Sequence, residues 1–350
     1  MALGFTPAVN IYGANAALLN QRLISWEHID AAGFESDQLT LTIDLEGIEG
    51  LPNLGGKIGL QVGYRETAMV DKGLFKVTRL TPTLFPFRLT LVATAAPFSK
   101  DDETGFKQRR TASHGPTTLG GLFRKLVELH GFSPRVAPEI SLIRIEHIDQ
   151  SNETDMGFVT RLAKKYNVVA KPYGDVYVLA RPGQTKSLSG QILPDVTLSV
   201  THNNRPGDHA FISATLEESA REQAKGCKTC FWDAAAGVLR WVETGVAPFK
   251  TLRQKQPSEA DAIAVGEGEV RKMLRQKYKV KITCPGDPRL AAEGLVLLDE
   301  SWPDFMRGRW SIDKVTASGS RENSYRCLID ASCLDPKADS KDWFTSISQR

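Results

Sequence analysis

The stretch 258–334 constrains the fold most strongly, because its pattern changes from helical to strand-like without a break. Ser258 can cap a helix that has Glu259 and Asp261 in its first turn. A side-chain oxygen at the cap and acids near the positive helix end both favour a start there. From residue 278 to 284, apolar residues alternate with lysines, which predicts a half-buried strand. The sequence therefore predicts a helix that continues directly into a strand.

The predicted strand ends at the sequence Pro285-Gly286-Asp287-Pro288. Proline has no amide hydrogen for a strand ladder, and glycine accepts a positive φ, so this sequence predicts a corner. Three further strands are predicted at residues 294–298, 309–317 and 325–334, the last two joined by a polar turn at 318–323. The stretch thus predicts a helix followed by a small antiparallel sheet.

Three segments, in the same order along the chain, resemble the phage late-control D family. They are residues 33–39 with the alternating Leu41, Ile43 and Leu45, residues 150–163, and residues 283–288 with 308–312. The second contains Asn152-Glu153-Thr154-Asp155, where the family tends to have Asn-Glu-Ser-Asp, and Thr154 still offers a hydroxyl for capping. The resemblance covers roughly residues 15–335. Members of this family are baseplate hubs of contractile phage tails and of R-type, phage-tail-like bacteriocins.

This resemblance implies a fold, an assembly and a set of partners. The implied fold is α+β but mainly β, with two small tube-protein-like β-barrels and inserted α+β domains. The implied assembly is a homotrimer, whose six barrels form a ring between a sixfold tail tube and a threefold central spike. The implied partners are the central spike protein, the tail tube protein or tube initiator, the tape-measure protein and other baseplate proteins. The implied location is the baseplate of a virion or a pyocin-like particle, assembled in the bacterial cytoplasm.

The first part of the chain reads as strands and turns. Short alternating segments separated by Gly- or Pro-containing breaks predict a small barrel or sandwich. These segments are residues 23–30, 38–46, 57–64, 73–80 and 88–95. We place the first barrel at residues 1–100. The polar stretch 100–116 fits a solvated linker better than a partner-facing loop.

Helical and strand patterns divide the rest of the chain. Helices at 118–130 and 155–166 and a strand at 175–179 predict an inserted α+β domain. The remaining divisions combine strand patterns at 195–201, 209–215 and 237–243 with the family resemblance. The expected units are the inserted domain at 101–185, a second barrel made of 186–250 and 285–335, a helix-strand insertion at 251–284, and a polar C-terminal tail at 336–350 that carries Trp343-Phe344.

Composition limits the possible classes of protein. With 41% hydrophobic and 24% charged residues, the 350-residue chain is too apolar for disorder. A net charge of +3 gives no overall field for nucleic acid, so no specific nucleic-acid binding is expected. No run approaches about 18 apolar residues, so no membrane span is expected, and residues 1–21 lack the basic start of a signal peptide. Five cysteines without a signal peptide favour reduced thiols.

Candidate metal and nucleophile motifs are weak. Cys227-Lys228-Thr229-Cys230 lacks the second ligand pair that structural zinc needs, so buried thiols are the favoured interpretation. Ser25, His28 and Asp30 resemble a catalytic triad, but on one strand Ser25 points away from the other two. The sequence 316–320 contains Ser318 but fits a turn rather than a nucleophile elbow.

Phosphate-binding loops and paired acids are also weak candidates. Residues 50–58 are out of register for a P-loop, and Gly266-Glu267-Gly268-Glu269 places acids where a pyrophosphate would lie. Glu35 and Asp37 could serve a glycan-cleaving enzyme, but acids beside a strand start are more often solvated. The sequence therefore predicts no catalytic, cofactor-binding or metal-binding residues. Two alternatives stay open: a tail-associated peptidoglycan hydrolase, and a hub or spike adaptor of a related secretion machine.

Overall fold

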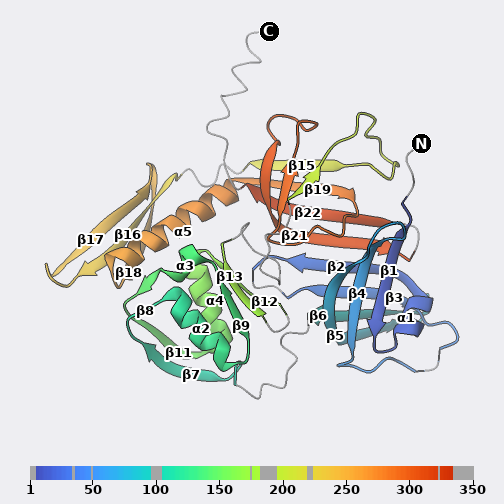
Figure 1. Ribbon diagram of the computed structural model, residues 1–350, viewed down its shortest axis with the longest axis horizontal. Coiled ribbons are helices and arrows are strands. Elements are labelled where there is room, and N and C mark those ends of the chain that lie inside the picture. Colours follow the sequence, from blue (N-terminus) through green and yellow to red (C-terminus); the bar gives the residue numbers. More distant parts are fainter. Residues whose placement is uncertain are drawn as a thin grey trace, which may run out of the picture.

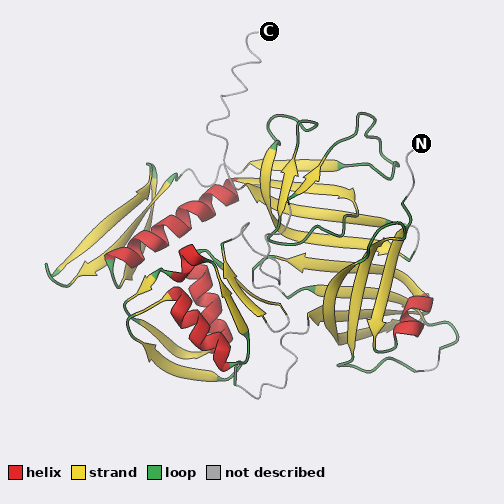
Figure 2. Cartoon of the chain, viewed as in Figure 1, coloured by secondary structure: helices red, strands yellow, loops and turns green. Residues whose placement is uncertain are grey.

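Strands dominate the architecture, which confirms a mainly β fold (Figure 2). The computed structural model describes residues 5–33, 36–48, 50–95, 105–173, 176–181, 195–218, 224–321 and 324–333. The predicted tail at 336–350, with Trp343-Phe344, and the acid Glu35 lie outside these ranges.

The first half of the main sheet is built from the N-terminal strands, at the right of Figure 1. Its elements are β1 (Pro7–Gly13), α1 (Ala16–Arg22), β2 (Leu23–Ala31), β3 (Gln38–Asp44), β4 (Lys57–Tyr64), β5 (Val70–Thr83) and β6 (Arg88–Ala95). They pair in the order β1-β4-β5-β6-β3-β2. The five predicted strands are confirmed, whereas β1 and α1 were not predicted. Only Ile11 of β1 is buried, so this strand carries no clear alternation.

The second half of the sheet is built from C-terminal strands, drawn in yellow to red in Figure 1. Its elements are β14 (Val196–Leu198), β15 (Ser213–Glu218), β19 (Tyr278–Pro285), β20 (Leu295–Leu298), β21 (Gly308–Ser320) and β22 (Tyr325–Cys333). The order continues from β2 as β21-β22-β19-β15, and β20 pairs with both β21 and β14. Antiparallel pairing of β2 with β21, from Ser25↔Ser320 to Ala31↔Lys314, joins the two halves.

One hydrophobic core runs through both halves of this sheet. Alternation explains it in the first half, because Leu39, Leu41 and Ile43 all point to the same face and are at most 2% exposed. In the second half, the alternating residues Val280 and Ile282 of β19 are buried in the same core. The alternation seen in the sequence therefore identifies the buried faces correctly.

The inserted domain has a separate core, drawn in green in Figure 1. Its elements are β7 (Arg109–His114), β8 (Thr117–Thr118), α2 (Leu119–Leu129), β9 (Ser133–Val136), α3 (Pro138–Ser141), β10 (Arg144–Ile145), β11 (Ile148–Thr154), α4 (Asp155–Tyr166), β12 (Val169–Tyr173) and β13 (Val176–Ala180). The helices predicted at 118–130 and 155–166 are confirmed as α2 and α4. The linker expected at 100–116 needs correction, because its residues 109–114 form β7 and pair with β11.

A third unit departs from the expected division of the chain. Strands β16 (Gly226–Asp233), β17 (Val238–Gly245) and β18 (Phe249–Gln256) form their own sheet in the order β17-β16-β18. They pack on α5 (Glu259–Lys277), so β16 and β17 lie outside the sheet that the segment 186–250 was expected to join. Conversely, β19, expected within the 251–284 insertion, belongs to the main sheet. The hydroxyl of Thr229 attaches β16 to α5, because it donates to the Ala262 carbonyl at 2.8 Å.

The predicted helix-to-strand transition is confirmed. The hydroxyl of Ser258 accepts the Asp261 amide and caps α5, which runs into β19 without an intervening residue. The reason given for the following corner needs correction. Gly286 has no positive φ; instead, a Cβ there would lie 2.1 Å from the Tyr325 ring. Glycine is needed at this position because an aromatic ring packs directly on the backbone.

Candidate functional site

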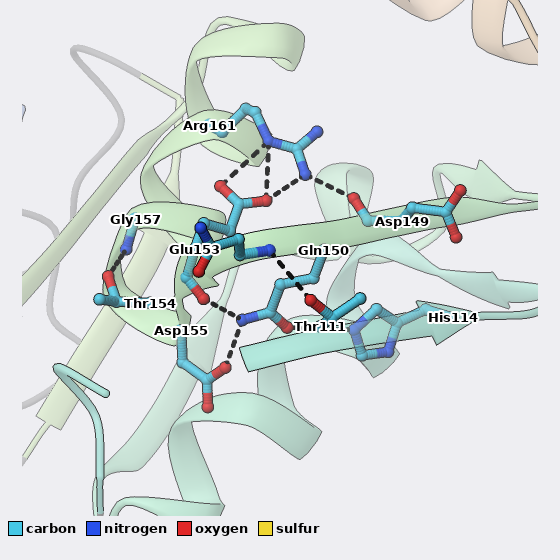
Figure 3. A network of polar contacts seen from close by, with 10 residues as sticks. Thr111, His114, Asp149, Gln150, Glu153, Thr154, Asp155, Gly157 and Arg161 are labelled. Carbon is cyan, nitrogen blue, oxygen red and sulfur yellow. Dashed lines mark hydrogen bonds and ion pairs between the residues drawn. The ribbon is translucent and has the colours of Figure 1, made fainter. Parts of the chain in front are cut away.

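The start of α4 carries a network of polar contacts inside the family-like segment 150–163 (Figure 3). The hydroxyl of Thr154 accepts the Gly157 amide at 2.9 Å and so caps the helix, as predicted from the sequence. The Arg161 guanidinium pairs with Glu153 and donates to the carbonyl of Asp149 at 2.7 Å. These contacts fix the turn between β11 and α4.

The carboxylate of Asp155 lies fully buried beneath this turn. Its Oδ1 accepts from Gln150 Nε2 at 2.7 Å, and its Oδ2 lies 2.6 Å from His130 Nε2 and 2.7 Å from an Arg110 nitrogen. The partners come from β11, from the end of α2 and from β7. A buried carboxylate surrounded by donors on three elements has a structural role, because those contacts compensate its lost hydration.

A second buried polar cluster joins the inserted domain to the main sheet. Lys171 of β12 is 6% exposed, and its Nζ lies 2.8 Å from Asp37 Oδ1 and 3.2 Å from Asp30 Oδ1. The same Nζ donates to the Ala31 carbonyl at 2.7 Å. The other oxygen of Asp30 accepts the amide of Ala292 at 2.9 Å. One lysine of the inserted domain therefore meets two carboxylates and a carbonyl of the sheet.

Burial sets the protonation of this cluster. Burial and the neighbouring Asp30 raise the pKa of Asp37 to about 6. Burial alone would raise the pKa of Asp30 as well, but Lys171, His28, Lys72 and the Ala292 amide together outweigh it, so the pKa of Asp30 lies below its ordinary value. Burial raises the pKa of Glu293, which accepts the Gly33 amide at 2.8 Å, to about 7. The cluster is thus a charge-compensated junction.

The triad-like residues of β2 do not come together. The ring of His28 is buried against Phe75, with ring centroids 5.4 Å apart, and burial lowers the pKa of His28 to about 4. Ser25 lies in a surface hollow with Ser318, on the other side of the strand. Asp30 binds Lys171 rather than the histidine. No nucleophile faces a base in this group.

The remaining sequence candidates also take structural positions. Cys227 and Cys230 are buried free thiols on β16, and burial raises the pKa of Cys227 to about 11. Among the described residues, no group of three or more His, Cys, Asp or Glu side chains is arranged to hold a metal. Gly266 packs α5 against β17, since a Cβ there would lie 2.4 Å from the Thr244 hydroxyl. A phosphate loop leads into a helix, whereas residues 50–58 lead into the strand β4.

Sequence reasoning missed Lys171 and Glu293. Lys171 is the one charged residue in the run Val168-Val169-Ala170-Lys171-Pro172-Tyr173, and a lone cation in an apolar strand indicates a buried ion pair. That signal could have identified the lysine but not its partners, which lie 134 and 141 residues away.

Comparison with known proteins places these features in context. No protein-family model matches the chain. Over 188 residues it is 32% identical to a probable baseplate hub protein of Escherichia phage P2, covering 53% of this chain and 48% of that protein. Over 196 residues it is 31% identical to a probable baseplate hub protein of Escherichia phage 186, covering 56% and 49%. The resemblance to phage hub proteins is confirmed. The chain spans about half the length of the curated relatives it matches.

Solved structures share the fold at low sequence identity. A 43 kDa tail protein of prophage MuSo2 from Shewanella oneidensis matches with a TM-score of 0.62 and 13% identity, covering 93% of this chain and 98% of that one. An E. coli component of the type VI secretion system, itself described as similar to T4 tail proteins gp27 and gp5, matches with a TM-score of 0.55 and 13% identity, covering 94% and 77%. None of the described helices is both long and apolar enough to cross a membrane.

Proposed function

We propose that this chain is a structural baseplate hub of a contractile injection particle. On this proposal it forms a homotrimer that joins the sixfold tail tube to the threefold central spike. The proposed hub role rests mainly on the sequence identity of 32% and 31% to two phage proteins that are named probable baseplate hub proteins. The shared fold of tail proteins supports it independently.

Two alike β-modules per chain are the geometric basis of the proposed trimer. Two features recur in the halves of the main sheet and support this arrangement. A helix continues into a strand without a loop in both, at α1–β2 and at α5–β19. The longest strand of each half, β5 with 14 residues and β21 with 13, forms a hairpin with the next strand. Six such modules in a threefold ring would present nearly sixfold geometry to a tube.

The proposed role is non-enzymatic. The buried acids Asp37, Asp155 and Asp261 are engaged by Lys171, by His130 and Arg110, and by Tyr166 and Ser258, in that order. Ser25 and His28 occupy opposite sides of β2. A peptidoglycan hydrolase of the lysozyme type, which cleaves the glycan, uses two accessible carboxylates on either side of the bound sugar. A cell-wall zymogram of the purified chain is expected to show no clearing. A cleared band would replace the structural role with the hydrolase.

The proposed partners follow from the hub position. They are the central spike protein, the tail tube protein or tube initiator, the tape-measure protein and other baseplate proteins, in a particle assembled in the bacterial cytoplasm. The test is electron microscopy of the purified chain alone and after mixing with a purified central spike protein of a contractile phage tail. We expect ring-shaped trimers that gain an axial density on adding the spike. Monomers that ignore the spike would contradict the proposal.

A second candidate is an adaptor in a related secretion machine. The match to the type VI secretion component favours it, because that protein shares the fold over 94% of this chain. Co-expression with tube proteins of both kinds distinguishes the two roles. Binding to a phage-type tail tube alone supports the baseplate hub, and binding to the secretion-system tube alone supports the adaptor.

A further inference from the structure

The outer face of the sheet β17-β16-β18 exposes a group of large apolar side chains. Trp232 is 49% exposed, Trp241 47% and Leu239 37%. Thr229 donates to α5, so its neighbours at alternating positions face away from the helix. Strand pairing sets Trp232 opposite Leu239 and Cys230 opposite Trp241 on that outer face. In Figure 1 this sheet projects beyond α5 at the left of the molecule.

The segment that forms this sheet has a higher net positive charge than the whole chain. Residues 224–256 hold six Lys or Arg and two Asp or Glu, a net charge of +4, against +3 for all 350 residues. Three of these cations are paired with acids: Lys228 with Glu243, Arg240 with Asp233 and Lys250 with Glu269. A further two, Arg253 and Lys255, have no carboxylate within ion-pair distance among the described residues. Lys255 Nζ lies 5.8 Å from the Trp232 ring, so a cation borders the apolar group.

Strand β17 is also an edge of this sheet over the residues that the structure describes. The amide of Val246, just after β17, donates to the carbonyl of Lys225, just before β16. Because bonding alternates along an antiparallel pair, the backbone groups of Leu239, Trp241 and Glu243 then point away from β16. An extended peptide can add to such an edge through its main chain and place alternate side chains over the face.

We propose that this outer face and the β17 edge bind an acidic, extended segment of another protein. The segment adds as a strand to β17 and lays apolar side chains against Leu239 and Trp241. The net charge of +4 on residues 224–256 favours acidic side chains in the segment. This inference does not depend on the hub role. A second copy of the chain fits poorly, because two units of net charge +4 repel each other. A nucleic acid also fits poorly, because few of the cations are free of carboxylates.

The test selects ligands without assuming their sequence. The full chain is immobilised and used to select from a displayed library of random twelve-residue peptides, with the double variant W241S/K255E as the subtracting surface. We expect the enriched peptides to alternate acidic and apolar residues. We expect the best synthetic peptide to lose at least tenfold in affinity on W241S/K255E, and to keep its affinity on the exposed-lysine control K125E. An enriched pool no more acidic than the input overturns the proposal.

Two further readouts decide the mode of binding and the class of ligand. Amide hydrogen exchange at Leu239, Trp241 and Glu243 is expected to slow when the peptide is bound, whereas unchanged exchange there overturns strand addition. A twenty-nucleotide single-stranded DNA and anionic phosphatidylglycerol vesicles are tested in parallel. Binding of either one more tightly than the best peptide, with loss on W241S/K255E, would assign the surface to that ligand instead. Equal thermal unfolding of the variants shows that they are folded.

Discussion

The Nζ of Lys171 lies 2.8 Å from Oδ1 of Asp37, although 134 residues separate the two along the chain. Lys171 belongs to the inserted domain, and Asp37 stands immediately before β3 of the main sheet. Their side chains are only 6% and 16% exposed. This ion pair therefore fixes one domain against the other in a place with little water.

Replacing Lys171 with methionine tests that junction. K171M leaves Asp30 and Asp37 without their cation, and breaking one side of a buried pair costs about 3–5 kcal/mol. We expect a loss of about 3 kcal/mol in unfolding free energy, measured by urea denaturation, together with faster proteolysis between the inserted domain and the sheet. The control K125M, at an exposed position of α2, is expected to change stability by less than about 0.5 kcal/mol. Equal stability of the two variants would show that the junction is held by other contacts.

The pH dependence of stability tests Glu293. Burial raises its pKa from 4.5 to about 7, so the folded chain holds this proton more tightly than the unfolded chain does. The stability that this carboxyl contributes is full below about pH 4.5, is lost as the pH rises to about 7, and is constant above that.

The variant E293Q removes this titration and keeps an oxygen for the Gly33 amide. Relative to the wild type it is expected to gain on the order of 2–3 kcal/mol between pH 4.5 and pH 8, since each unit of pKa difference is worth about 1.4 kcal/mol. Urea denaturation at both pH values measures the difference. The exposed E267Q is the control. A stability difference between E293Q and the wild type that does not change with pH contradicts the assignment.

The buried carboxylate of Asp155 makes a prediction for the inserted domain. D155N keeps the shape of the side chain but removes the charge that faces Arg110 and replaces an acceptor by a donor. We expect a loss of about 2–3 kcal/mol and faster amide exchange throughout α4. Glu153, the partly exposed partner of Arg161, gives the comparison, because E153Q is expected to cost less than about 1 kcal/mol. Similar losses for both variants would show that burial of Asp155 contributes little.

The corner after β19 makes a prediction about packing. G286A places a methyl group where the Tyr325 ring now lies, and this ring belongs to the main core. Forcing it aside is expected to cost about 1–3 kcal/mol. The control G115A has open space around its Cβ and no positive φ, so it is expected to be nearly neutral. Thermal unfolding of the two variants, followed by near-ultraviolet circular dichroism, measures both effects. A neutral G286A would contradict the close-approach explanation.

Local patterns account for what the sequence could predict. Alternation identified β2 to β6 and β19 to β22, and cap residues with apolar spacing identified α2, α4 and α5. Each of these signals lies within a dozen or so residues. The strand predicted at 237–243 is confirmed as β17, but its separate sheet with β16 and β18 was not predicted, because local patterns do not indicate which strands pair.

Long-range pairing was beyond the reach of those patterns. The sequence does not indicate that β2 pairs with β21, nor that Lys171 crosses from the inserted domain to Asp30. The reason for Gly286 was wrong for a related cause: its neighbour, the Tyr325 ring, lies 39 residues further along the chain. The predictions failed where contacts between segments that are distant in the sequence determine the structure.

The trimer of paired β-modules is the central claim, and end-on electron-microscopy averages of the purified protein test it most directly. The account predicts rings with threefold symmetry and six similar lobes around an axial opening, with three chains per particle by native mass spectrometry. Particles of a single chain, or rings with three lobes only, would contradict it.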